Sequence, residues 1–187
     1  MRRFNPDILI VYFSHEGEAF WDGGIRTLEQ GNTKRVAEII AKSLNGVLLR
    51  IQPVASYPHD YYECLEAAKR EQQQDALPEI RTFRGEYPPL EFDITDFGNY
   101  RLVFLGFPIW WGQAPQCILT FLDGIKSDGA FILPFCTHEG TGFGSSVQRL
   151  KNRYPNTSFG TGLAIQGSKV DRSRAQIEAW AKMFYTQ

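Results

Sequence analysis

The chain has 187 residues, of which 43% are hydrophobic and 22% are charged, and these fractions exclude a disordered or fibrous protein. Twenty basic and twenty-one acidic side chains give a net charge of −1, which argues against a nucleic-acid binder because such proteins need a basic excess. The length is typical of one domain, which we expect to span residues 1–187.

The sequence lacks the features of a membrane span, a signal peptide or a metal site. Apolar runs are far shorter than the ~20 residues of a membrane span. Met1-Arg2-Arg3 and the short run after it lack the features of a signal peptide. Cys64, Cys117 and Cys136 have no metal-like spacing and are expected to be free, buried thiols. These features favour a cytoplasmic protein with no membrane span and no metal site.

Short apolar runs alternate with amphipathic helical patterns in the first half of the chain. Residues 8–13 are apolar on both faces, as in a central parallel strand. A helical pattern follows and ends at Asn45-Gly46. A strand is predicted over 47–51 and a helix from about residue 61 to the glutamines at 72–74, whereas the polar, proline-bearing stretch 78–99 predicts a loop.

The alternation continues in the second half. The predicted elements are, in order, a strand over 102–106, a helix that ends at Gly124, a strand over 130–136, a helix, a strand over 162–165 and a last helix. Ser145 with Gln148, and Ser173 with Gln176, have the spacing of a capping box at the starts of the two later helices. Such an order predicts a parallel sheet covered by helices on both faces, with ligands at the carboxyl ends of the strands.

Polar residues follow the first strand, where a ligand is expected. Ser14 comes directly after the strand, and Gly31-Asn32-Thr33 opens the first helix after an interval. Hydroxyls, an amide and the N–H groups of a helix start can bind an anion, with the helix dipole adding ~0.3–1 kcal/mol. The alternative is plain capping, because Asn32 is itself a good N-cap residue.

Aromatic residues make up 14% of the chain, which is more than a core alone requires. Two adjacent indoles, Trp110 and Trp111, follow the third parallel strand between prolines and glycines. The simplest arrangement has one ring packed against the protein and the other facing a flat ligand, and the alternative is that both rings pack within the loop. After the fourth strand, the glycines of residues 137–144 let the backbone approach a ligand closely.

These three loops, taken together and in this order, resemble those of the flavodoxin-like FMN proteins. Ser14 and Gly31-Asn32-Thr33 match the two ends of the family's phosphate loop, S-x-T-G-N-T. Residues 108–112 and 135–140 resemble the two loops that flank the isoalloxazine ring. The resemblance covers nearly the whole chain and implies a three-layer α/β/α sandwich with a five-stranded parallel sheet in the order 2-1-3-4-5.

The resemblance implies FMN as the cofactor and assigns roles to residues of these loops. Ser14, Asn32 and Thr33 would bind the phosphate, and Trp110 would pack on the isoalloxazine with Trp111 as its support or as a second wall. No catalytic residue is assigned, because the flavin itself carries the chemistry. The cofactor-binding residues implied are Ser14, His15, Asn32, Thr33, Pro108, Ile109, Trp110, Trp111, Gly112, Thr137, His138, Glu139, Gly140 and Gly142.

The chain departs from the family pattern between Ser14 and Gly31. Residues 16–30 split the phosphate loop and include the aromatic pair Phe20-Trp21. This insertion is predicted to form a lid over the flavin, to shape a substrate pocket, or to join the interface of a homodimer. The central threonine of the motif has no counterpart.

The resemblance leaves three possibilities open: two redox functions and a module without cofactor. The chain is predicted to be an FMN-dependent oxidoreductase that takes hydride from NAD(P)H and reduces a small acceptor such as a quinone. A non-enzymatic electron carrier between redox partner proteins is the second reading, disfavoured by the net charge of −1 because carriers dock through strong charge. The third is a flavodoxin-like module that has lost FMN.

Overall fold

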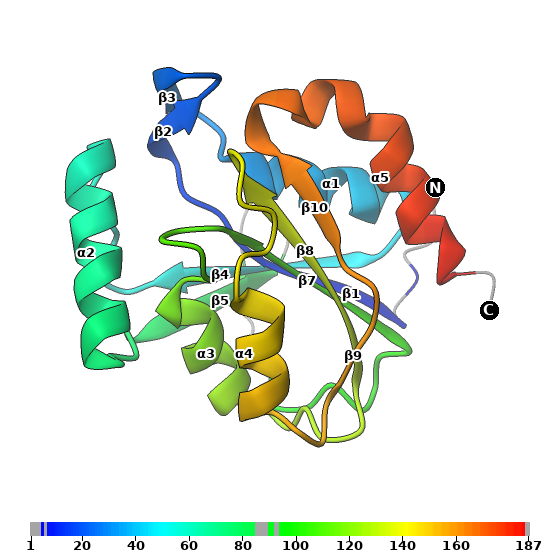
Figure 1. The fold of residues 1–187 in the computed structure, drawn as a ribbon. Coiled ribbons are helices and arrows are strands. Elements are labelled where there is room, and N and C mark those ends of the chain that lie inside the picture. Colours follow the sequence, from blue (N-terminus) through cyan, green and yellow to red (C-terminus); the bar gives the residue numbers. More distant parts are fainter. Residues whose placement is uncertain (1–4, 6, 85–89, 92–93, 186–187) are drawn as a thin grey trace.

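The computed structural model describes residues 5, 7–84, 90–91 and 94–185, and Figure 1 shows their arrangement. Met1-Arg2-Arg3 and part of the stretch 78–99 lie outside the described residues. The elements are β1 (Ile8–Phe13), β2 (Gly17–Trp21), β3 (Gly24–Leu28), α1 (Asn32–Leu44), β4 (Val47–Pro53), α2 (Tyr61–Gln74), β5 (Ile80–Arg84), β6 (Leu90–Glu91), β7 (Leu102–Pro108), α3 (Gln116–Asp123), β8 (Phe131–His138), α4 (Ser146–Arg153), β9 (Ser158–Phe159), β10 (Leu163–Gln166), a 3₁₀ helix (Gly167–Ser173) and α5 (Arg174–Met183).

The central sheet has the predicted parallel core. Its strands run in the order β4-β1-β7-β8-β10, all parallel, which is the predicted order 2-1-3-4-5. The sheet differs from the prediction at its edge, where β5 and β6 continue it beyond β4 in antiparallel pairing. The stretch 78–99, predicted as a loop, therefore contributes edge strands. The sequence did not indicate these strands, because the polar side chains and prolines that edge strands tolerate are also typical of loops.

Helices cover both faces of the sheet, as Figure 1 shows. α1 and α5 pack on one face, and α2, α3 and α4 pack on the other. The residues of β1 are buried along the whole strand, because each face of this central strand meets a helix layer. The carboxyl ends of β1, β7 and β8 consequently meet at one edge, where the loops that follow them lie together.

Helix ends agree with the prediction in part. Asn45 ends α1 in the left-handed conformation, and Gly124 ends α3. Both predicted capping boxes are absent, because neither Ser145 nor Ser173 caps its helix with its side chain. The Ser173 hydroxyl donates to the Lys169 carbonyl of the preceding 3₁₀ helix instead. Asn32 is the first residue of α1, and the N-cap position belongs to Gly31.

Residues 17–28 form a β-hairpin that is separate from the main sheet. Strands β2 and β3 pair with each other in antiparallel register, with Trp21 opposite Gly24. The two turn residues, Asp22 and Gly23, have φ values of 48° and 91°. Positive φ at both positions is typical of the two-residue turns that join the strands of a hairpin, for which Asp-Gly is a favoured sequence.

Among the described residues, no helix is both long enough and apolar enough to cross a membrane. The three cysteines are free and buried, as predicted.

Candidate functional site

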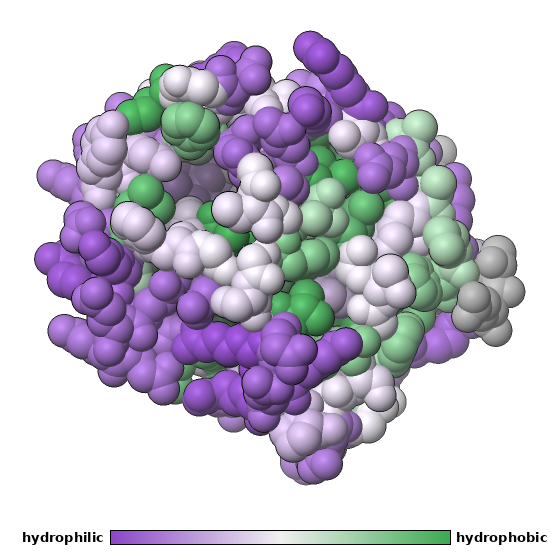
Figure 2. Space-filling view, in the orientation of Figure 1, coloured by the Kyte–Doolittle hydropathy of each residue, from purple (hydrophilic) through white to green (hydrophobic). Residues whose placement is uncertain are grey.

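A cavity of about 580 Å³ opens at the carboxyl ends of β1, β7 and β8. In Figure 2 the surface is hollowed below the hairpin, with hydrophobic side chains at the rim. The volume lies within the ~300–1,000 Å³ typical of ligand sites. Its walls include twelve of the residues that the sequence assigned to cofactor binding: Ser14, His15, Asn32, Thr33, Pro108, Ile109, Trp110, Trp111, Gly112, Thr137, His138 and Glu139.

One end of the cavity is formed by the start of α1. The Ser14 Oγ accepts a hydrogen bond from the Lys34 N–H at 3.1 Å, so its own proton is available for a ligand. The N–H groups of a first helical turn lack acceptors within the helix. Gly31 lets this turn approach β1 closely, because a Cβ on it would lie 2.2 Å from the His15 carbonyl oxygen. This end can bind an anion through neutral donors.

Two hydrogen bonds connect the start of α1 and the loop after β7 to the end of β8. The Thr33 and Thr137 hydroxyls lie 2.8 Å apart and are buried, which connects α1 to the end of β8. The Ile109 N–H donates to the Thr137 carbonyl at 2.9 Å, which connects the loop after β7 to β8. The anion-binding end and the tryptophan loop are therefore fixed relative to each other.

The two tryptophans differ in exposure, and Trp111 is the more exposed of the two. Trp110 is 9% exposed, and its ring packs edge-on against Phe13, His15 and Tyr57 at centroid distances of 4.9–5.6 Å. Trp111 is 49% exposed and lines the cavity. The resemblance implies stacking by Trp110 with Trp111 as its support or a second wall; both rings line the cavity, and the ring of Trp111 is the more accessible.

The turn that carries Trp111 is fixed from both sides. Residues Trp110 and Gln113 exchange two backbone hydrogen bonds, of 2.9 and 3.0 Å. On the α2 side, the Trp111 Nε1–H donates to the Leu65 carbonyl at 2.7 Å. The same ring lies 5.0 Å from the Lys69 ammonium, an arrangement that is typical of a cation–π contact. The indole orientation is thus set before any ligand binds.

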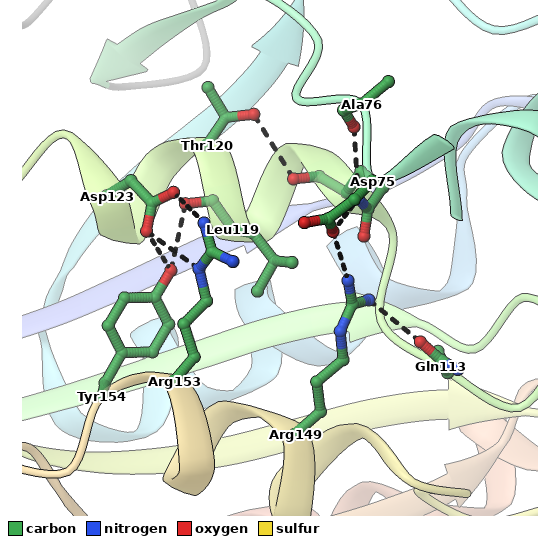
Figure 3. A network of polar contacts seen from close by, with 10 residues as sticks. Asp75, Ala76, Gln113, Leu119, Thr120, Asp123, Arg149, Arg153 and Tyr154 are labelled. Carbon is green, nitrogen blue, oxygen red and sulfur yellow. Dashed lines mark hydrogen bonds and ion pairs between the residues drawn. The ribbon is translucent and has the colours of Figure 1, made fainter. Parts of the chain in front are cut away.

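A polar network fixes the same turn from the α4 side (Figure 3). Arg149 reaches from α4 and donates to Gln113 at 2.9 Å and to Asp75, which ends α2, at 3.1 Å. The Ser145 N–H, just before α4, donates to the Gly112 carbonyl at 2.9 Å. The turn is therefore bonded to elements that are distant in sequence, which is why the sequence alone could not give its geometry.

Glu139 has a structural role at the cavity wall. Its carboxylate accepts hydrogen bonds from Gln166 and from both the N–H and the hydroxyl of Ser168, at 2.7–3.1 Å. Gly140 and Gly142 lie outside the cavity lining, and Thr141 lies in it. The Gly140 N–H donates to His138 Nδ1 at 2.9 Å, so this glycine belongs to the turn that shapes the wall.

The hairpin and α2 supply wall residues that the sequence did not assign. From the hairpin these are Glu18, Ala19, Phe20 and Leu28, and from α2 they are Tyr61, Cys64 and Leu65; Thr141 and Gly167 complete the set. The Asp22-Gly23 pair was the signal for a hairpin, since it separates two strand-forming runs. Burial raises the pKa of the Cys64 thiol to about 12, so this thiol is protonated at neutral pH.

His15 lies under the hairpin beside Trp110. Burial, with a smaller contribution from His59, lowers the pKa of His15 to about 4, and Glu16 opposes this shift. The imidazole is therefore neutral at pH 7. Within the described part of the chain, no group of three or more His, Cys, Asp or Glu side chains could bind a metal ion.

The lowered pKa of His15 predicts a pH dependence of stability. Between the ordinary value of 6.5 and about 4, the unfolded chain binds a proton that the folded chain does not. The free energy of unfolding should therefore decrease as the pH is lowered through this window, by about 1–3 kcal/mol from this group. Urea denaturation of wild type and His15→Gln at pH 7, 5.5 and 4.5 would measure it. Equal losses in both proteins would contradict the assignment.

Comparisons with known proteins agree with this geometry. A family model described as Flavodoxin matches residues 27–184. An inferred flavoprotein of Bacteroides eggerthii has 26% identity and a TM-score of 0.68, and the match covers 98% of this chain and 100% of that one. A flavoprotein of Lactobacillus acidophilus, crystallised in complex with FMN, has 25% identity and a TM-score of 0.61, and the match covers 90% of this chain and 98% of that one. The curated proteins contain no match.

The matched model covers most of the chain, including α1, the tryptophan loop and the loop after β8. The matched stretch contains many of the cavity-lining residues, whereas Ser14, His15 and most of the hairpin precede it. The chain therefore belongs to the flavodoxin family.

Proposed function

We propose that the chain binds FMN in this cavity and is an FMN-dependent oxidoreductase that reduces a small acceptor such as a quinone. The observation that carries the proposal is the pairing of an anion-binding helix start with a presented indole across one cavity. Ser14 and the first turn of α1 suit the phosphate, and Trp111 suits the isoalloxazine. When bound, FMN supplies two-electron chemistry.

The overall reaction balances without a catalytic side chain. One reduced nicotinamide loses a hydride, which carries two electrons and one proton, and water supplies a second proton. The quinone gains two electrons and two protons and leaves as the hydroquinone. The residues of the chain bind and orient the two partners, and the neutral His15 adds no charge to the cavity.

A small acceptor is favoured over a protein partner by charge and by shape. The net charge of −1 gives little electrostatic steering toward a partner protein. The hairpin and α2 add walls to the cavity, and such walls suit a molecule that enters rather than a surface that docks.

The test of cofactor binding is the visible absorbance of the purified protein after incubation with FMN and removal of free cofactor. We expect a yellow protein with one FMN per chain and flavin fluorescence quenched by the indole. Ser14→Ala should weaken FMN binding by about 10- to 100-fold, because one hydrogen bond to a charged group contributes ~1.5–3 kcal/mol. A colourless wild-type protein that takes up no FMN would contradict the proposal.

The test of the reaction is the oxidation of NAD(P)H by the FMN-loaded protein in the presence of a quinone. We expect turnover that depends on both substrates. A loaded protein that oxidises no NAD(P)H with any quinone, but exchanges electrons with a partner flavoenzyme, would support the carrier instead.

A further inference from the structure

The cavity divides by chemistry into two ends. Toward α1 and the end of β8 its walls are polar, with Ser14, Asn32, Thr33 and Thr137. Toward the hairpin and α2 its walls are mainly apolar and aromatic, with Ala19, Phe20, Leu28, Tyr61 and Leu65. The polar end and the Trp111 face are the parts that the proposed cofactor site uses. The apolar end has no assigned occupant.

Phe20 is the residue of the apolar end that is best placed to contact a ligand. It lines the cavity and yet is 40% exposed. Its ring lies 6.4 Å from that of Tyr61 at an interplanar angle of 34°, so the two rings are tilted and do not stack closely, and both residues line the cavity. An exposed ring at the wall of a cavity can gain contact area from a second flat molecule.

The hairpin that carries Phe20 is fixed in place. The Glu18 N–H donates to the His59 carbonyl at 2.8 Å, and the Glu18 carboxylate accepts from the Tyr61 N–H at 3.1 Å. These bonds connect β2 to the start of α2, so the aromatic wall is formed in advance. They also engage the carboxylate of Glu18, which is the acidic residue of this wall.

The neighbouring Trp21 is different, although it is equally aromatic. It does not belong to the cavity lining, and the Arg26 guanidinium lies over its ring at 4.9 Å. Trp21 is therefore a control of the same strand and the same chemical type.

From this arrangement we infer that the β2–β3 hairpin and α2 form the binding wall for the electron acceptor, and that Phe20 determines its specificity by packing on an uncharged, planar, apolar ring. The inference rests on the proposed function, since it assigns the substrate of the same site. It separates the aromatic pair Phe20-Trp21: Phe20 contacts the acceptor, whereas Trp21 lies against Arg26 outside the cavity lining.

The experiment is calorimetric titration of the purified protein, with and without saturating FMN, using 2,3-dimethyl-1,4-naphthoquinone and no electron donor. Both reactive ring positions of this probe are blocked, so it cannot alkylate Cys64. We expect Phe20→Ala to weaken quinone binding by about 5- to 10-fold while FMN affinity changes less than twofold, and Phe20→Leu to have an intermediate effect. Trp21→Ala should leave quinone affinity at the wild-type value.

The outcomes separate the two proposals. Equal affinities of wild type and Phe20→Ala for the quinone would overturn the inference, as would a parallel loss of FMN affinity, which would place Phe20 in the cofactor site. Loss of quinone binding in Trp21→Ala but not in Phe20→Ala would also overturn it. A protein that binds the quinone through Phe20 but never takes up FMN would sustain the hairpin as a binding wall and contradict the proposed function.

Discussion

Gly31→Ala is expected to lower the affinity for FMN by about 10- to 100-fold. The new Cβ would lie 2.2 Å from the His15 carbonyl oxygen and 2.3 Å from the Ser14 Oγ. Neither atom can withdraw cheaply, because His15 O is backbone and Ser14 Oγ accepts from the Lys34 N–H. Overpacking of this kind costs about 1–3 kcal/mol, and here the displacement falls on the proposed phosphate-binding turn.

Fluorescence titration of FMN against both proteins would measure this loss. Gly124→Ala is the matched control, since the Cβ there would meet its nearest neighbours at an ordinary 3.5 Å and Gly124 is not part of the cavity lining. The φ of Gly31 is −64°, which alanine adopts freely, so the effect is steric. If Gly31→Ala bound FMN like wild type, the phosphate would have to lie elsewhere.

Gly106→Ala adds one methyl group inside the sheet and is expected to lower the free energy of unfolding by about 2–3 kcal/mol. Gly106 lies on β7 opposite Phe135 of β8, and a Cβ would come within 2.1 Å of the Phe135 ring. Phe135 is fully buried, so its ring has no open space to enter.

A double-mutant cycle in urea, with Gly106→Ala, Phe135→Leu and the double variant, tests the cause. Leucine removes the ring atoms that a Cβ at position 106 would meet, so the double variant should lose about 1 kcal/mol less than the sum of the single losses. Strict additivity would show that the strain at Gly106 has another origin.

The parallel core was predictable because its strands are buried on both faces. Residues 8–13 read as an unbroken apolar run, and each such run has one preferred place in a sheet between helix layers. The cavity position followed from the same rule, since the carboxyl ends of parallel strands meet at one edge. Most residues that the loops contribute could therefore be assigned from the sequence.

What could not be predicted depends on contacts between distant parts of the chain. Trp110 is packed because Tyr57 and Phe13 surround it, and nothing local distinguishes it from Trp111. Ser145 has the spacing of a cap, but its N–H and hydroxyl both turn to the Gly112 carbonyl. Strand β5 pairs with β4 at the sheet edge, where polar residues are allowed, so its sequence reads as a loop.

The separateness of the hairpin has an evolutionary consequence. Strands β2 and β3 pair only with each other in the described sheets, and the core residues of the two helix layers lie elsewhere. Substitutions at the tip and flanks of this hairpin can therefore accumulate with little penalty for folding. If the hairpin binds the acceptor as proposed, acceptor specificity can be redesigned in this one short segment without disturbing the core.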